Sequence, residues 1–342
     1  MQKRFASLKR PSLQTAIAIE IILVASAAAF FLPGGDDLYR FYLPFAQGCL
    51  ECGFNPWYAS WVLFPITLVP LRLLWPLWVL LTLSGLFWTC RRMEVNPIPV
   101  MLAFPVMGLA WLGQVEVVIA VGLMLALLSP SPSLRGAGLV LAMIKPQVAG
   151  AAVLVLIVYD REHWKTLIVP ALIAALSMLV WGIDWPLRWF NQRDLTAALP
   201  VWGTAALYPY GLIAFGAVLL VKGVREKVTA ALLASALAFP WFGVYSYSVF
   251  LPLIAPWWAL PVSYAWLLAY PAMQHLSMKF AWVLPLSLLV YLVWPSIKES
   301  KTGQSVLRRV RRSTPEDDPD PGKQDHAPDG ARDDAQEPER TA

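Results

Sequence analysis

The chain has 342 residues and a net charge of +5, and 58% of its residues are hydrophobic whereas only 14% are charged. A water-soluble globular protein normally carries more charge, so this composition excludes an ordinary soluble domain. Apolar runs recur between short polar breaks, and about 20 helical residues are needed to cross a hydrocarbon layer. The apolar runs do not alternate as barrel strands do, so we predict an all-α fold: a polytopic transmembrane helical bundle of about 10–12 helices.

The first apolar run, residues 13–32, follows a basic start that contains Lys3, Arg4, Lys9 and Arg10. Cytoplasmic segments of membrane proteins are enriched in Lys and Arg, so we place the N-terminus in the cytoplasm. A secretory signal peptide also has a basic start, but its apolar core is shorter. We interpret this run as an uncleaved first transmembrane helix.

The stretch from residue 33 to residue 72 is predicted to be the first extracytoplasmic loop. It is rich in aromatic residues and broken by prolines, so we expect short interfacial helices that lie on the outer membrane surface. Cys49 and Cys52 form a C-x-x-C pair in this loop, and we predict a structural disulfide between them, with a redox role as the alternative. Two thiols are too few for a metal site by themselves, and we predict no cofactor, leaving a divalent cation open.

Basic residues mark the later cytoplasmic turns: Arg91, Arg92, Arg135, Arg161, Lys165, Lys222, Arg225 and Lys227. Between these marks, hairpins are expected to reach the outer side near 113–114, near 145–146, at 183–205 and at 245–248. This arrangement places both termini in the cytoplasm. The prolines between residues 240 and 280 leave the helix count there open between ten and twelve in total.

The C-terminal tail differs from the rest of the chain. Residues 298–312 are basic, and the stretch from Thr314 onward has ten acidic residues and almost no aliphatic ones. Such a segment buries too little apolar surface to fold, so we expect residues 298–342 to be a disordered cytoplasmic tail. Residues 1–297 would then form one transmembrane domain.

Two adjacent aspartates, Asp36 and Asp37, follow the first apolar run at the predicted outer membrane boundary. A carboxylate there remains in reach of water and of a lipid-bound substrate, which suits a general base. The structural alternative is that both residues only end one helix and cap the next, because Asp is a common N-cap. No nucleotide-binding loop, zinc motif or G-x-S-x-G elbow competes with this site.

Several short motifs follow Asp37 in a fixed order. They are Asp37-Leu38 with Phe41-Tyr42, Asn55-Pro56-Trp57, Pro65, Gly113-Gln114 and Lys145-Pro146. This order resembles the GT-C superfamily of membrane glycosyltransferases, and most closely glycosyltransferase family 87, whose known members use polyprenyl-phosphate mannose. The resemblance covers roughly residues 30 to 165, and its force comes from the order and placement of the motifs.

The resemblance implies an enzyme in the plasma (inner) membrane that transfers a sugar from a polyprenyl-phosphate donor. The acceptor would be a glycolipid, a glycan or a protein on the extracytoplasmic side, with inversion at the anomeric carbon. One base suffices because the phosphate is already a good leaving group; we assign Asp37 this role, with Asp36 second. Membrane lipids are the other expected partners, and no nucleic acid is expected.

Other residues are candidates for binding the substrate. A leaving phosphate calls for fixed cations, and the candidates are Arg40, Lys145, Arg188, Arg193 and Lys279. Sugar hydroxyls and the phosphate have further candidates in Tyr42, Trp57, Trp61, Gln114, Glu116, Gln147 and His275. Each also has a structural alternative: Lys145 snorkelling from a hairpin, Gln114 and Glu116 packing helices together, or the tryptophans forming an interfacial belt.

Two other functions remain open. A transporter or flippase of lipid-linked sugars would also place ionisable residues such as Glu20, Glu116 and Lys145 in the membrane, although no internal repeat is visible. A non-catalytic membrane subunit is the third reading, because the C-terminal half carries no recognisable motif.

Overall fold

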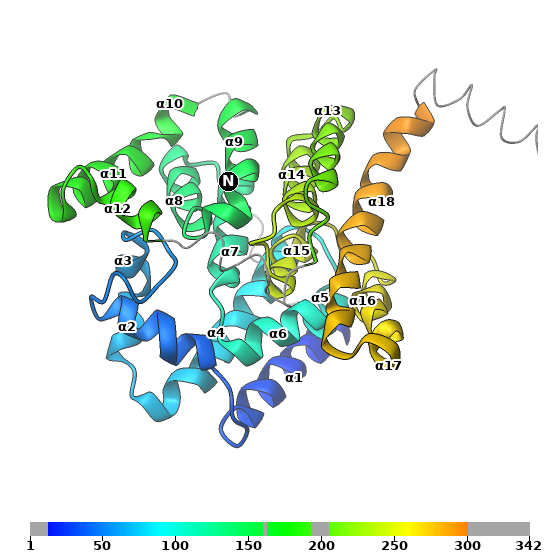
Figure 1. Ribbon diagram of the computed structural model, residues 1–342, viewed down its shortest axis with the longest axis horizontal. Helices are drawn as coiled ribbons and strands as arrows, with labels where there is room; N and C mark the ends of the chain where they lie inside the picture. Colours follow the sequence, from blue (N-terminus) through cyan, green and yellow to red (C-terminus); the bar gives the residue numbers. More distant parts are fainter. Residues whose placement is uncertain (1–12, 160–162, 193–204, 300–342) are drawn as a thin grey trace, which may run out of the picture. The chain divides into compact units, whose positions relative to one another are not determined.

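The computed structural model describes residues 13–159, 163–192 and 205–299 (Figure 1). Throughout these ranges the secondary structure is helical, without a β-strand, which confirms the predicted all-α class. Contacts divide the chain into residues 1–296 and 297–342, and the first unit contains nearly all of the described helices. Lys298 and Glu299, the first two residues of the tail predicted to be disordered, are helical and end α18 (Val283–Glu299); the rest of that tail lies outside the described residues, as does Arg193.

The first unit begins with one long helix, a series of short ones and a second long helix. In chain order these are α1 (Leu13–Ala28), the π-helix η1 (Leu38–Tyr42), α2 (Leu43–Ala46), α3 (Ala59–Leu63), the 3₁₀ helix η2 (Phe64–Leu68) and α4 (Leu71–Arg92). The predicted outer loop, residues 33–72, therefore does form short helices. The disulfide between Cys49 and Cys52 is present in the same loop, as predicted.

The middle of the chain forms helix pairs that are separated by short breaks. They are α5 (Pro97–Leu102), α6 (Phe104–Leu112), α7 (Glu116–Leu128), α8 (Pro132–Ala142), α9 (Pro146–Tyr159), α10 (His163–Thr166), α11 (Ile168–Trp181) and α12 (Trp185–Asn191). Proline opens α5, α8 and α9, where its missing N–H costs nothing because the first turn has no acceptor for it.

The last part of the unit has two long helices among shorter ones, and the elements labelled η in this part are 3₁₀ helices. They are η3 (Tyr210–Gly216), α13 (Ala217–Leu220), α14 (Val224–Ala238), η4 (Val244–Val249), α15 (Leu251–Ile254), α16 (Ala259–Ser263), η5 (Ala265–Ala269), α17 (Tyr270–Met273), η6 (Gln274–Trp282) and α18 (Val283–Glu299). Between residues 240 and 280 the chain forms short helices of four to nine residues, some of them with a proline, and their shortness is why the sequence did not define them.

Three helical stretches are long and apolar enough to cross a membrane: Leu71–Arg92, Trp164–Trp181 and Leu276–Lys298. A fourth span results if α6 and α7, which meet at an angle of 118°, are counted together. This number, which holds for the described residues, is smaller than the 10–12 helices expected. Two shorter apolar helices, α1 and α9, have 16 and 14 residues.

The centre of the unit is formed by α4, α7, α8, α9 and α14. Helix α7 packs against both α8 and α4, and α14 packs against α9. Every residue of α14 from Lys227 to Ala238 is buried. Glycines allow the closest of these contacts, because a Cβ at Gly122 would lie 2.7 Å from the backbone of α8. Helix α11, by contrast, buries only Ser177 and exposes an apolar surface of the kind that lipid contact requires.

Turns that the sequence assigned to the cytoplasmic side contact one another. Arg225 Nη2 donates to the carbonyl oxygen of Met93 at 2.8 Å; it also donates at 2.6 Å to that of Leu253, a residue that the sequence assigned to neither side. The Lys227 ammonium lies 5.0 Å from the ring centre of Tyr159, at the end of α9. The basic turns therefore lie near one another in the fold, as one common membrane face requires.

Candidate active site

A glycine turn brings Asp37 to its position after α1. Gly35 has a φ of +76°, and a Cβ on it would lie 2.9 Å from the indole of Trp75. The Gly35 N–H donates to the carbonyl oxygen of Trp111 at 2.7 Å, so the chain is fixed against the end of α6. The two aspartates follow at once: Asp36 is exposed, whereas Asp37 is partly buried.

The break between α6 and α7 also depends on a glycine. Gly113 has a φ of +74°, a left-handed conformation that residues with a Cβ adopt only at a cost. A Cβ there would lie 2.7 Å from that of Leu38, the neighbour of Asp37. Trp78 Nε1 donates to the carbonyl oxygen of Gln114 at 3.1 Å and holds the backbone at the break. The Gln114 side chain is thereby brought to Asp37.

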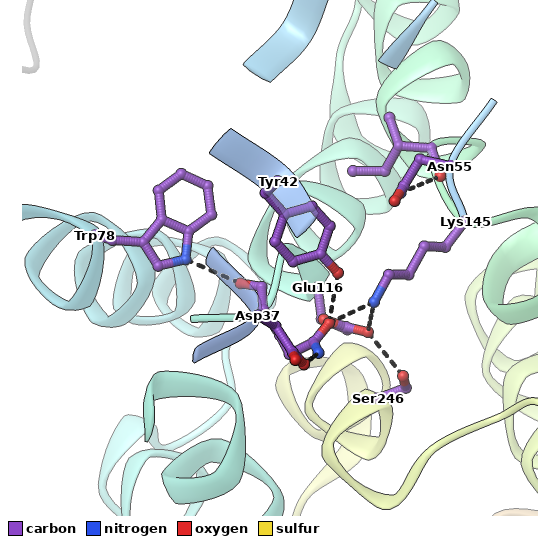
Figure 2. Close-up of polar contacts among 9 residues, drawn as sticks. Asp37, Tyr42, Asn55, Trp78, Glu116, Lys145 and Ser246 are labelled. Carbon is purple, nitrogen blue, oxygen red and sulfur yellow. Dashed lines mark hydrogen bonds and ion pairs between the residues drawn. The ribbon is translucent and has the colours of Figure 1, made fainter. Parts of the chain in front are cut away.

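The side-chain amide of Gln114 connects three polar groups. Its Oε1 accepts from the Tyr42 hydroxyl and from Lys145 Nζ, both at 2.6 Å, and its Nε2 donates to Asp37 Oδ2. An ammonium group has donors only, so the oxygen of the amide must face Lys145 and the nitrogen must face Asp37. Figure 2 shows Asp37, Tyr42 and Lys145 converging in this way.

Lys145 lies between α8 and α9, at the second break. Its Nζ is 2.7 Å from Glu116 Oε1, and the two side chains are 8% and 0% exposed. Ser246 Oγ on η4 donates to the same carboxylate oxygen at 2.8 Å (Figure 2). The ring centres of Tyr42 and Tyr245 lie 5.6 and 5.2 Å from the ammonium. A buried charge requires such compensation, and here the lysine receives it from a carboxylate and two aromatic faces.

The predicted outer loop is tied to this second break. Asn55, which is 2% exposed, donates from Nδ2 to the carbonyl oxygen of Ile144 at 2.7 Å. Ile144 directly precedes Lys145, so this hydrogen bond fixes the backbone from which the lysine side chain extends (Figure 2). Four of the sequence motifs, at Asp37, Asn55, Gln114 and Lys145, thus meet in one place.

Burial raises the pKa of the Asp37 carboxyl above its usual value. The Lys145 charge and the hydrogen bond from Gln114 act in the opposite direction without cancelling this effect. Among contacts of the described residues, Asp37 Oδ1 has no hydrogen-bond partner, whereas Oδ2 accepts from Gln114. The carboxylate is therefore held at one oxygen and open at the other, which suits proton transfer.

Asp36 and Arg40 form a separate pair at the surface. Arg40 Nε lies 2.8 Å from Asp36 Oδ1, one helical turn away, and both side chains are more than half exposed. Arg40 follows Asp37 on η1 and is thus an exposed cation on the element next to the carboxylate. Asp36 is not part of the buried cluster.

The aromatic candidates are largely occupied by other protein groups. Trp57 is 4% exposed, with the Trp185 ring stacked at 5.9 Å and the Arg188 guanidinium 4.8 Å from its centre. Trp61 stacks on Trp181 at 4.7 Å. Arg188 also pairs with Asp184 at 3.2 Å. These contacts fasten α3 to α11 and α12 and leave little of Trp57 for a ligand.

The remaining predicted residues lie apart from these contacts. Gln147 is the second residue of α9, and its buried Oε1 has no hydrogen-bond partner among the described residues. Lys279 lies on η6. His275 belongs to the same segment, but its side chain lies outside the described part of the chain. Neither Gln147 nor Lys279 has a described contact with the Asp37 cluster.

Sequence reasoning missed two residues of the cluster, Tyr245 and Ser246. It assigned 245–248 to the same side of the membrane as 113–114 and 145–146, yet it found no motif in the C-terminal half. The assignment of all three segments to one side of the membrane was the signal that could have identified Tyr245 and Ser246.

The buried carboxylate of Glu116 keeps a second oxygen, Oε2, without a hydrogen-bond partner among the described residues.

The described part of the chain has no group of three or more His, Cys, Asp or Glu side chains placed to hold a metal ion. No family model, curated protein or solved structure matches this chain. A functional proposal therefore has to start from the geometry of the site.

Proposed function

We propose that the protein is an integral-membrane glycosyltransferase that takes a sugar, mannose or another hexose, from a polyprenyl-phosphate donor. The observation that carries the proposal is the carboxylate of Asp37, which is partly buried, fixed by Gln114 at one oxygen and open at the other. The motifs that resemble the GT-C superfamily supply the cluster around it. The apolar composition and the long apolar helices support a location in the membrane.

In the proposed reaction, the acceptor hydroxyl donates its proton to Asp37 Oδ1 as its oxygen attacks the anomeric carbon. The bond between that carbon and the phosphate oxygen breaks, and the polyprenyl phosphate leaves with the electron pair. Attack opposite the leaving group inverts the anomeric centre. The exposed guanidinium of Arg40, next to Asp37 on η1, is the described cation best placed to stabilise the growing phosphate charge.

The proposal includes a topology. Both termini would be cytoplasmic, and the site would face the extracytoplasmic side of the plasma (inner) membrane, in a bundle of about 10–12 crossings made partly of short or broken helices. Two contact sets support this topology. The basic turns contact one another, and the segments assigned to the outer side contact one another around Asp37.

Purified protein in lipid nanodiscs, incubated with labelled polyprenyl-phosphate mannose and candidate acceptors, tests the proposal. We expect Asp37→Asn to lose about 10²- to 10⁴-fold in kcat, the usual contribution of a general base. Glu51→Gln is the matched control, because it removes an exposed carboxylate from the same loop, where Glu51 accepts from Gln192 at 3.3 Å and not from the cluster. Equal turnover by folded Asp37→Asn protein would remove the proposed base.

A second candidate is a transporter or flippase of lipid-linked sugars. The feature that favours it is the sharp bend between α6 and α7 beside the buried Lys145–Glu116 pair, because transporters often form their sites at broken helices. Movement of the labelled lipid across sealed vesicles without any transfer product, equal in wild type and Asp37→Asn, would favour this function.

A further inference from the structure

We infer that Lys145, Glu116 and Ser246 are positioning residues: together they orient the Gln114 amide so that it donates to Asp37, and they do not themselves contact the sugar or the phosphate. This inference rests on the proposed function and deepens it. It gives Lys145 a role other than that of a cation for the leaving phosphate. It also assigns a role to η4, in the half of the chain without motifs.

The hydrogen bonds of the cluster hold Lys145 at Glu116 and lead from Lys145 through Gln114 to Asp37. Ser246 donates to Glu116, Lys145 donates to Glu116 and to Gln114, and Gln114 donates to Asp37. An amide can be rotated by half a turn and still fill the same space. Two groups oppose that rotation: the Lys145 ammonium, which only donates, and the ionised Asp37 carboxylate, which only accepts; the Tyr42 hydroxyl can do either. Once Asp37 has taken up a proton, the ammonium is the group that still holds the amide in place.

A rotated Gln114 amide would direct its oxygen at the Asp37 carboxylate. Two acceptors would then face each other in a partly buried site, and the carboxylate would turn away or take up a proton. In either case Oδ1 would lose the position from which it takes a proton. The activity of Asp37 would therefore depend on a lysine that the acceptor never contacts.

The burial of Lys145 argues against direct contact with a phosphate. Its side chain is 8% exposed, two of its three donor directions go to Glu116 and Gln114, and the rings of Tyr42 and Tyr245 lie beside it. A phosphate would have to displace one of these groups. Arg40 is exposed and pairs with Asp36 through Nε, so its other guanidinium donors can reach a phosphate without displacing a buried group.

Two serines of η4 provide a matched pair for the test. Ser246 donates to Glu116, whereas Ser248 is equally buried and its Oγ has no partner among the described residues. We expect Ser246→Ala to lower kcat about 2- to 10-fold, as the loss of one hydrogen bond predicts, and to leave the KM for the donor lipid unchanged. Ser248→Ala should change neither value. Equal kinetics for the two variants, or a raised donor KM in Ser246→Ala, would overturn the inference.

The pH dependence of Asp37 gives a second test, whose readout does not depend on turnover. The charged groups that face Asp37 are Lys145, Glu116 and Asp36, and the neighbouring titratable groups are Tyr42 and Tyr245. Lys145→Met removes the one cation of this set, so Asp37 should bind its proton more tightly. Lys145→Arg keeps the charge and should shift the midpoint less.

The midpoint is measured on the folded protein by the rate at which a hydrophobic carbodiimide modifies Asp37, located by mass spectrometry across a pH series. This reagent reacts with the protonated carboxyl and requires no substrate. We expect a higher midpoint in Lys145→Met than in wild type, and an unchanged midpoint would overturn the inference. A higher midpoint in Lys145→Met, together with wild-type protein that transfers no sugar, would refute the proposed function and not the orientation of Gln114.

Discussion

A single added methyl group at Gly113 should destabilise the candidate site. The left-handed backbone at this residue, with a φ of +74°, costs a residue with a Cβ about 1–2 kcal/mol. The new Cβ would also lie 2.7 Å from that of Leu38 and 3.2 Å from Gly35 Cα. Such overpacking typically costs about 1–3 kcal/mol. Gly113→Ala should therefore lower the free energy of unfolding by about 2–5 kcal/mol.

Gly150 is the matched control. It lies inside α9, and a Cβ built on it meets nothing within 4 Å. The same substitution there should raise the free energy of unfolding by about 0.5–1 kcal/mol, because alanine loses less backbone entropy than glycine in a helix. One chemical change is thus expected to have opposite signs at two positions.

Denaturant titration in mixed micelles, followed by tryptophan fluorescence, measures both effects. Gly113→Ala should also reduce turnover at temperatures where the protein stays folded, because Leu38 must move and Asp37 precedes it directly in the chain. Equal unfolding free energies for Gly113→Ala and Gly150→Ala would refute the left-handed break between α6 and α7. Such a result would also mean that the backbone at residue 113 does not require a glycine.

Three further predictions concern the same cluster. Tyr42→Phe removes the 2.6 Å hydrogen bond to Gln114, and we expect a loss of about 0.5–1.5 kcal/mol in the same unfolding assay. Asn55→Ala leaves the carbonyl oxygen of Ile144 without its donor, and a loss of about 1–3 kcal/mol is expected, with wild-type-like stability as the contrary result. The base must be ionised, so kcat/KM should fall as pH falls through the pKa of Asp37. Because burial raises that pKa, a pH–rate profile should place the midpoint of this fall above 3.8, the ordinary pKa of an aspartate.

The sequence predicted the local features of this fold better than its contacts. Apolar composition defined the all-helical class, and prolines and glycines marked the breaks at Gly113 and before Pro146 because those residues act on their own backbone. The partner of each break depends on packing between distant segments, which no local pattern encodes. Ser246, 130 residues from Glu116, was missed for this reason.

The helix count was less predictable, and the reason is physical. A run of apolar residues satisfies the same hydropathy rule whether it crosses in one helix, bends sharply as α6 and α7 do, or breaks into short helices as between residues 240 and 280. Prolines and 3₁₀ turns shorten a helix without making it less apolar. Length and hydropathy therefore predict that these segments lie in apolar surroundings better than they predict how many helices the segments form.

The polar side chains at the breaks meet a requirement for stability and, under the proposed function, a requirement of the site together. A helix that stops in apolar surroundings leaves backbone carbonyls that need donors. Trp78 supplies one to Gln114, and Asn55 supplies one to Ile144, next to Lys145. The same two donors fix the backbones from which the Gln114 and Lys145 side chains reach the carboxylate. The residues that satisfy the backbone at these breaks therefore also place the polar groups around Asp37. Each short motif along the chain can be understood as a helix break together with the side chain that bonds to its backbone.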